Sequence, residues 1–143
     1  MSVNQFEVFS DSLLTIVKGK ALYSGNSTDS FQEITEAASN TLKVKRASIW
    51  MYSQDRSSIE SMDLYESTSN THSKGEKLSK TDFPAYFAAL AEDRFINADN
   101  AHQDHRTAEF SEDYLAPLGI ESMLDAPIRF GGRTIGVICL EHI

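Results

Sequence analysis

The chain has 143 residues, enough for one domain with one sizeable core and too few for two. Its 41% hydrophobic and 24% charged residues, with a mean hydropathy of -0.33, exclude a disordered or fibrous protein. Thirteen Lys and Arg against 21 Asp and Glu give a net charge of -8, which repels nucleic acid and anionic membrane surfaces. We therefore expect neither as a partner.

The chain shows no targeting or membrane signal. No apolar run approaches the roughly 18 residues that a bilayer span requires, and the first five residues lack the basic start of a signal peptide. We expect a cytoplasmic protein. Cys139 is the single cysteine, so neither an internal disulfide nor a multi-cysteine zinc site can form.

Two helices are predicted first. Residues 1–19 carry an apolar stripe that is too short to distinguish a dimer seam from a helix covering a sheet: Phe6, Phe9, Leu13, Ile16 and Val17. Ser30 and Glu33 have the spacing of a capping box, which predicts that the second helix begins at Ser30. Its predicted buried stripe is Phe31, Ile34, Ala37/Ala38 and Thr41/Leu42, with Glu33, Glu36 and Asn40 facing water.

The later elements alternate between strands and helices. First come a central strand at 47–52, a more exposed partner strand at 59–66 and a loop at 67–80. A helix at 83–92, a short strand at 95–96 and a helix at 107–114, ended by 117–119, follow. The last two strands, at 120–128 and 134–140, are joined by a tight turn at Phe130-Gly131-Gly132-Arg133. This order predicts an α+β fold with a central antiparallel sheet of five to six strands.

Three passages resemble the GAF domain family. They are FINADNAHQDHR at 95–106, where a D-x-R turn precedes the fourth helix, LGIESMLDAPI at 118–128, and GGRTIGVICL at 131–140. The resemblance covers residues 25–143, so the whole chain, 1–143, is interpreted as a single GAF domain preceded by a possible linker or dimer helix.

The resemblance implies terminal helices on one face of the sheet and a ligand pocket roofed by helices on the other. The residues it places around a ligand are Trp50, Tyr86, Phe87, His105, Phe110, Tyr114, Met123 and Asp125. The aromatic members could equally fill the core. No catalytic residue and no metal ligand is assigned.

The resemblance also implies a function. It predicts a non-catalytic sensor of a larger bacterial signalling protein, such as a two-component histidine kinase or a diguanylate cyclase. A small molecule would control an output domain outside this chain, and the terminal helices would form a homodimer. The alternative is a structural dimerisation module with a filled pocket and no ligand.

Departures from the family patterns argue against its known cofactors and activity. Thr107-Ala108 stand near the Asn-Lys pair of cyclic-nucleotide-binding members, and Cys139 is not on the fourth helix, where a bilin is attached. One cysteine cannot run the disulfide cycle of the free methionine sulfoxide reductases. Haem is not expected either, and the cofactor, if any, is left open.

Three polar positions have competing interpretations. Asp125 lies mid-strand, where it could accept a hydrogen bond from a ligand, pair with Arg129 or Arg133, or be hydrated. His102 and His105 could be a pair of metal or haem ligands, or capping and solvated groups. Cys139 is expected to be a small buried apolar side chain.

Overall fold

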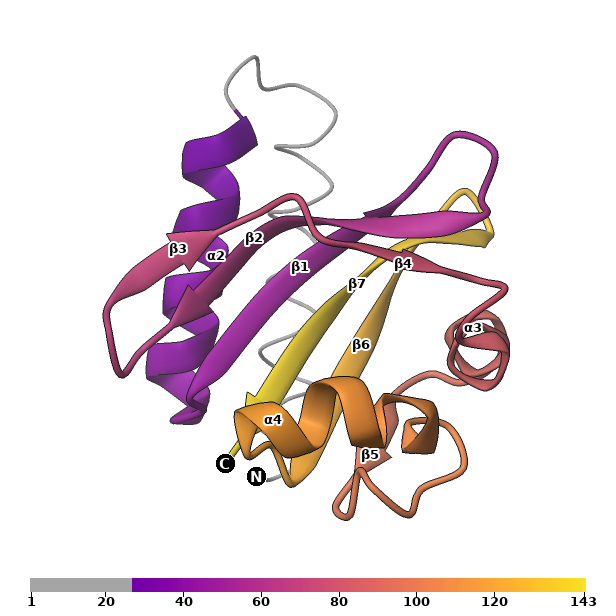
Figure 1. The fold of residues 1–143 in the computed structure, drawn as a ribbon. Helices are drawn as coiled ribbons and strands as arrows, with labels where there is room; N and C mark the ends of the chain where they lie inside the picture. Colours follow the sequence, from indigo (N-terminus) through magenta and orange to yellow (C-terminus); the bar gives the residue numbers. More distant parts are fainter. Residues whose placement is uncertain (1–26) are drawn as a thin grey trace.

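The structure is a computed structural model that describes residues 27–143, so the helix predicted over residues 1–19 lies outside them. The described residues form the predicted α+β fold (Figure 1). Its helical elements are α2 (Ser27–Leu42), α3 (Pro84–Glu92), η1 (Ala108–Phe110), η2 (Ser111–Leu115) and α4 (Ala116–Leu118). Its strands are β1 (Arg46–Tyr52), β2 (Ser58–Glu66), β3 (Thr71–Ser73), β4 (Lys77–Ser79), β5 (Ile96–Ala98), β6 (Ser122–Phe130) and β7 (Arg133–His142).

All strand pairs in the sheet are antiparallel, as predicted. The strand order is β3-β2-β1-β7-β6-β5, with β4 also paired to β2, so β1 is central. The sheet has seven strands and not five to six, because the predicted loop at 67–80 contains β3 and β4. Each of these strands has three residues and no buried one, so backbone pairing with β2 holds them without an apolar pattern.

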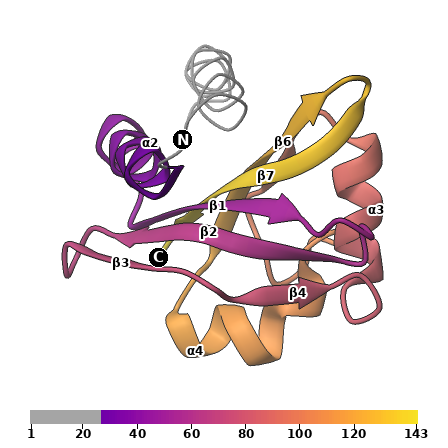
Figure 2. The same cartoon turned by 90° about the horizontal axis from the view of Figure 1, so that it is seen from above.

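Helices cover both faces of the sheet. Figure 2 shows α2 on one side of the sheet and α4 on the other, with α3 near the end of the sheet at which β1 connects to β2. The core is correspondingly divided: Ile49, Leu124 and Ile138 pack toward α2, and Trp50, Met123 and Val137 face the other helices. The alternation of strand side chains thus builds two apolar layers from the same three central strands.

The predicted start of α2 is wrong by three residues. The helix begins at Ser27, which puts Ser30 inside it and removes the predicted capping box. Phe31, Ile34 and Ala38 are buried as predicted. Ala37 and Thr41, from the predicted stripe, are exposed.

A bulge in the middle of strand β2 changes which of its side chains point to which face of the sheet. Trp50 of β1 pairs with Ser61, whereas Ile49 pairs with Asp63, so Met62 is an extra residue in the ladder. Such a bulge reverses which side chains point to which face. Ser61 therefore lies on the side of Trp50, and Asp63 reaches α2, where Thr35 donates a hydrogen bond to it over 2.6 Å.

The segment predicted as one helix at 107–114 is three short pieces. A 3-10 turn, a five-residue π-helical stretch and a short α-helical turn run continuously from Ala108 to Leu118. Pro117 was expected to help end the helix, but it lies in the first turn of α4, where its missing N–H costs nothing. Gly119, with a φ of 69°, ends the segment.

The predicted turn between the last two strands is confirmed. Gly131 and Gly132 join β6 to β7 with φ angles of 62° and 80°, which glycine adopts without steric cost. Among residues 27–143, no helix has the length and apolar character needed to cross a bilayer.

Candidate functional site

A cavity of about 50 Å³ lies between the sheet and the helices opposite α2. Its walls are mostly apolar or aromatic: Trp50, Leu78, Phe83, Tyr86, Phe110, Tyr114 and Met123. Three polar residues complete them: Ser48, Cys139 and Glu141. We call this space the pocket.

Strand alternation positions the floor of the pocket. Ser48 and Trp50 are two residues apart on β1, as are Cys139 and Glu141 on β7, so each pair points to the same face. The indole Nε1 of Trp50 donates to Ser48 Oγ over 2.8 Å, which satisfies the buried N–H and fixes the ring.

Stacked aromatic rings form the roof. Phe83, just before α3, stacks on Phe110 of η1 with 4.5 Å between the ring centroids. Tyr86 of α3 meets the same Phe110 ring edge-on at 4.9 Å. These contacts hold the two roof segments together and fill much of the space above the sheet.

Asp125 lies behind the pocket wall and is completely buried. Its Oδ2 accepts a hydrogen bond from the Tyr86 hydroxyl over 2.5 Å and a weaker one from Cys139 Sγ over 3.4 Å, whereas Oδ1 has no hydrogen-bond partner in the described part of the chain. Burial raises the pKa of Asp125 to about 7, although the Tyr86 hydrogen bond opposes that shift.

The predicted alternative that Asp125 pairs with Arg129 or Arg133 is therefore wrong. The guanidinium of Arg129 donates instead to the backbone carbonyl of Asp93 over 2.8 Å, and Arg133 is exposed. The carboxylate of Asp125 accepts instead from the buried hydroxyl of Tyr86.

Glu141 is one of the pocket residues that the sequence prediction missed. It is 1% exposed, and its Oε1 accepts from the Tyr114 hydroxyl at 2.9 Å and from Arg46 Nε at 3.4 Å. Burial raises the pKa of Glu141 against the opposing effect of Arg46. The available signal was its position two residues after Cys139 in an apolar strand, which places a carboxylate on the inner face. Leu78 was missed because β4 was predicted as loop.

The structure brings together five of the eight predicted site residues. Trp50, Tyr86, Phe110, Tyr114 and Met123 line the pocket. The other three do not: Phe87 packs in the core against Tyr86, Asp125 is behind Tyr86 and Cys139, and the side chain of His105 is 90% exposed. A ligand-binding role for any of them stays a prediction.

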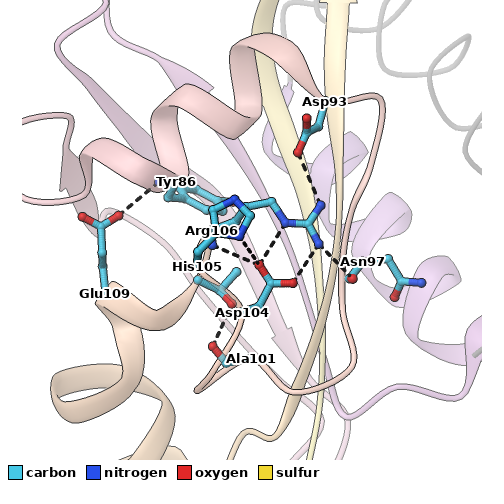
Figure 3. Close-up of polar contacts among 9 residues, drawn as sticks. Tyr86, Asp93, Asn97, Ala101, Asp104, His105, Arg106 and Glu109 are labelled. Atoms are coloured by element: carbon cyan, nitrogen blue, oxygen red, sulfur yellow. Dashed lines mark hydrogen bonds and ion pairs between the residues drawn. The ribbon is translucent and has the colours of Figure 1, made fainter.

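The polar stretch at 97–106 lies beside the pocket, and hydrogen bonds of Arg106 hold it in place. Figure 3 shows Arg106 between Asp104, Asp93 and Asn97. Its guanidinium makes two bonds of 2.8 and 2.9 Å to the carboxylate of Asp104, and others to Asp93 and to the carbonyl of Asn97. The D-x-R turn therefore ties the start of the roof segment to the end of α3.

His102 takes a structural position in this loop. Its two ring nitrogens contact Ser111 Oγ at 2.6 Å and the carbonyl of Ile120 at 3.1 Å. Within residues 27–143 no group of three or more His, Cys, Asp and Glu side chains is placed to hold a metal ion.

Glu109 joins the two roof segments. Its Oε1 accepts hydrogen bonds from the backbone N–H groups of Ala85 (2.9 Å) and Tyr86 (3.1 Å), as Figure 3 shows for Tyr86. A carboxylate at this end of a helix satisfies unpaired N–H groups and interacts favourably with the helix dipole. The position of Tyr86 thus depends on a residue of the other roof segment.

The antiparallel sheet with helices on both faces defines the class as an α+β domain, and the sequence profile described as GAF domain matches residues 27–143. The chain belongs to the GAF domain family. No curated protein matches the chain.

Solved GAF domains share the fold at low identity. The phycocyanobilin-bound GAF domain of a cyanobacterial phytochrome is 17% identical with a TM-score of 0.67, covering 99% of this chain and 81% of that one. A methyl-accepting chemotaxis protein is 19% identical, with a TM-score of 0.63 and coverage of 97% and 82%. The GAF domain of an Acinetobacter phosphoenolpyruvate-protein phosphotransferase is 16% identical, with a TM-score of 0.60 and coverage of 99% and 78%. GAF domains thus occur in signalling proteins of several kinds.

Proposed function

We propose that this GAF domain is a non-catalytic sensor that binds a small molecule in the pocket and thereby controls an attached output domain, such as a histidine kinase or a diguanylate cyclase. The observation that carries the proposal is the pocket itself. It is an internal space with aromatic walls and a buried carboxylate, Glu141, of which one oxygen has no partner. Apolar walls with a few polar groups are typical of ligand sites.

The fold offers a route from the pocket to α2. The strands β1 and β7 contribute alternate residues to both layers: Trp50 and Val137 face the pocket side, and Ile49 and Ile138 pack toward α2. A ligand that moves the pocket floor would change the packing under α2. It could bias the equilibrium between two states only by the difference in its affinity for them.

The size of the pocket bears on both candidate functions. A volume of about 50 Å³ is well below the roughly 300 Å³ or more of a typical ligand site, so a drug-sized ligand would have to displace the roof. The same observation favours the second candidate, a structural dimerisation module with a filled pocket.

A thermal-shift screen of small molecules, followed by native mass spectrometry, separates the two candidates. A ligand that binds only the folded domain must raise its melting temperature. The variant Met123→Trp, which fills the pocket, should abolish the shift, whereas Met62→Trp on the α2 side should retain it. An unliganded protein that no compound stabilises, and that is dimeric by sedimentation, would support the dimerisation module instead.

A further inference from the structure

The carboxylate of Glu141 presents an unused acceptor at the pocket wall. Both of its hydrogen-bond donors, the Tyr114 hydroxyl and Arg46 Nε, bind Oε1. The other oxygen, Oε2, is buried and has no hydrogen-bond partner within residues 27–143. A buried acceptor without a donor is unfavourable, so a ligand that brings a donor to Oε2 gains a favourable interaction there.

A second buried carboxylate lies on the next strand. Asp125 of β6 pairs in register with Cys139, two residues before Glu141 on β7. Its Oδ1 is also buried and has no hydrogen-bond partner among residues 27–143. The two acids are close enough for the charge of Glu141 to add to the effect of burial in disfavouring ionisation of Asp125. Two buried acidic side chains with unused acceptor oxygens therefore lie on neighbouring strands at this end of the pocket.

Little positive charge compensates these acids. Arg46 contacts Glu141, but its guanidinium is shared with Glu66, whose carboxylate lies 3.1 Å away on the outer side. The described residues that line the pocket include no Lys, Arg or His. An anionic ligand group would enter next to Glu141 without a cation to receive it.

The remaining walls suit the body of such a ligand. Trp50, Tyr86, Phe110 and Tyr114 surround the space with ring faces and edges. Aromatic rings stack on planar groups and attract cations to their faces.

From this arrangement we infer that the pocket selects a compact aromatic amine in its protonated form, with the ring among the aromatic walls and the ammonium donating to Oε2 of Glu141. The inference rests on the proposed function, because it names the ligand class of the same pocket. The volume of about 50 Å³ is below the roughly 150 Å³ of a cavity that holds benzene, so even a one-ring amine has to displace part of the roof as it binds.

Benzylamine, benzyl alcohol and benzoate are three probes of nearly the same shape with a positive, neutral and negative head. Binding of each to the purified domain can be followed at pH 7 by amide chemical shifts. We expect benzylamine to bind most tightly and benzoate not to bind. Glu141→Gln should weaken benzylamine roughly tenfold or more, since hydrogen bonds to charged groups are the strong ones, and should change benzyl alcohol less than threefold.

Glu66→Gln is the matched control. It neutralises the other carboxylate that contacts Arg46, outside the pocket, and should leave benzylamine affinity within about twofold. If Glu141→Gln fails to fold, the variant Met123→Trp tests the location of the ligand instead. Its indole ring fills the pocket, so the folded variant should no longer bind benzylamine.

Three outcomes decide the inference. Preference for benzylamine that is lost in Glu141→Gln supports it. Binding of benzyl alcohol or benzoate with no preference for benzylamine overturns it and leaves the proposed function standing. Absence of binding by all three probes, together with a negative thermal-shift screen, overturns both.

Discussion

The hydroxyl of Tyr86, on α3, donates a hydrogen bond of 2.5 Å to the carboxylate of Asp125, on β6. This contact joins the roof to the sheet across 39 residues of sequence, and both side chains are buried. Burial raises the pKa of Tyr86 well above its usual value, with a further contribution from Asp125, so the phenol remains the donor at neutral pH. Asp125 therefore sets how the roof sits on the sheet.

Stability should fall as pH rises through the titration of Asp125. Its folded-state pKa of about 7 exceeds its unfolded value of 3.8, so the folded domain binds the proton more tightly. The resulting stabilisation is fully present below about pH 4 and is lost as pH rises through 7. The free energy of unfolding of the natural protein, measured with urea, should fall by about 2 to 4 kcal/mol between pH 4 and pH 8 relative to that of Asp125→Asn, which cannot ionise.

Glu121→Gln, an exposed carboxylate just before β6, provides the control for that experiment. Its stability should follow the natural protein at every pH. Parallel stability curves for Asp125→Asn and the natural protein would show that Asp125 does not titrate in this range.

His72 should contribute a pH dependence of the same sign on the other side of the sheet, because its pKa is also raised in the folded domain. Its Nδ1 lies 2.7 Å from Asp63 Oδ2 and its Nε2 lies 2.6 Å from Glu36 Oε1, which links β3 to α2. Burial lowers the pKa of His72, but the hydrogen bonds with Glu36 and Asp63 outweigh it and raise the pKa overall. The link is complete below the unfolded pKa of about 6.5 and weakens as pH rises through the folded value.

We expect His72→Gln to cost about 1 kcal/mol at pH 5.5 and less at pH 8.5. The measurement is urea unfolding at both pH values, with His105→Gln, an exposed imidazole, as the control that changes neither. An equal cost at both pH values would mean that the charge of His72 contributes nothing to the link.

Removal of the Glu109 carboxylate should loosen the start of α3. Glu109→Ala leaves the N–H groups of Ala85 and Tyr86 without their acceptor, which should cost about 1 kcal/mol, and Glu109→Gln about half of that. Hydrogen exchange of these two amides should speed up with the loss. Glu112→Ala, an exposed carboxylate one turn further on, should leave both rates unchanged.

Gly136 should tolerate no side chain. A Cβ added there would overlap the carbonyl oxygen of Trp50 and lie 2.8 Å from the sulfur of Met51, in the centre of the sheet. We expect Gly136→Ala to destabilise the domain by at least about 2 kcal/mol, measured by thermal unfolding. Gly132→Asn, in the open β6–β7 turn, should cost less than about 1 kcal/mol, since asparagine tolerates positive φ. A loss at Gly136 no larger than the loss at Gly132 would show that the sheet makes room for the added Cβ.

Local patterns predicted most of the fold. The strand-like runs at 120–128 and 134–140, with Gly131-Gly132 between, predicted the last hairpin, because strand-forming residues and a tight turn are encoded by neighbouring residues. The short strands β3 and β4 were not predictable in this way, since they depend on pairing with β2. The bulge at Met62 likewise reverses the direction of the side chains along β2, and no pattern in the neighbouring residues predicted it.

The site was predicted less completely for the same reason. The resemblance named the aromatic residues of the roof, but it also placed His105 at the ligand, and His105 faces solvent. For Asp125, an arginine four or eight residues away was one of the predicted alternatives, whereas its partner is Tyr86.

By itself, the sequence determined the GAF family through three passages that resemble it. It also determined the central strand and the last hairpin, because periodicity and turn chemistry act over a few residues. Only the tertiary structure decided that Asp125 pairs with Tyr86 and that Glu141 faces the pocket with an oxygen that no described residue contacts. Burial and hydrogen-bond partners depend on which distant segments meet, and that is set by the packing of the whole domain.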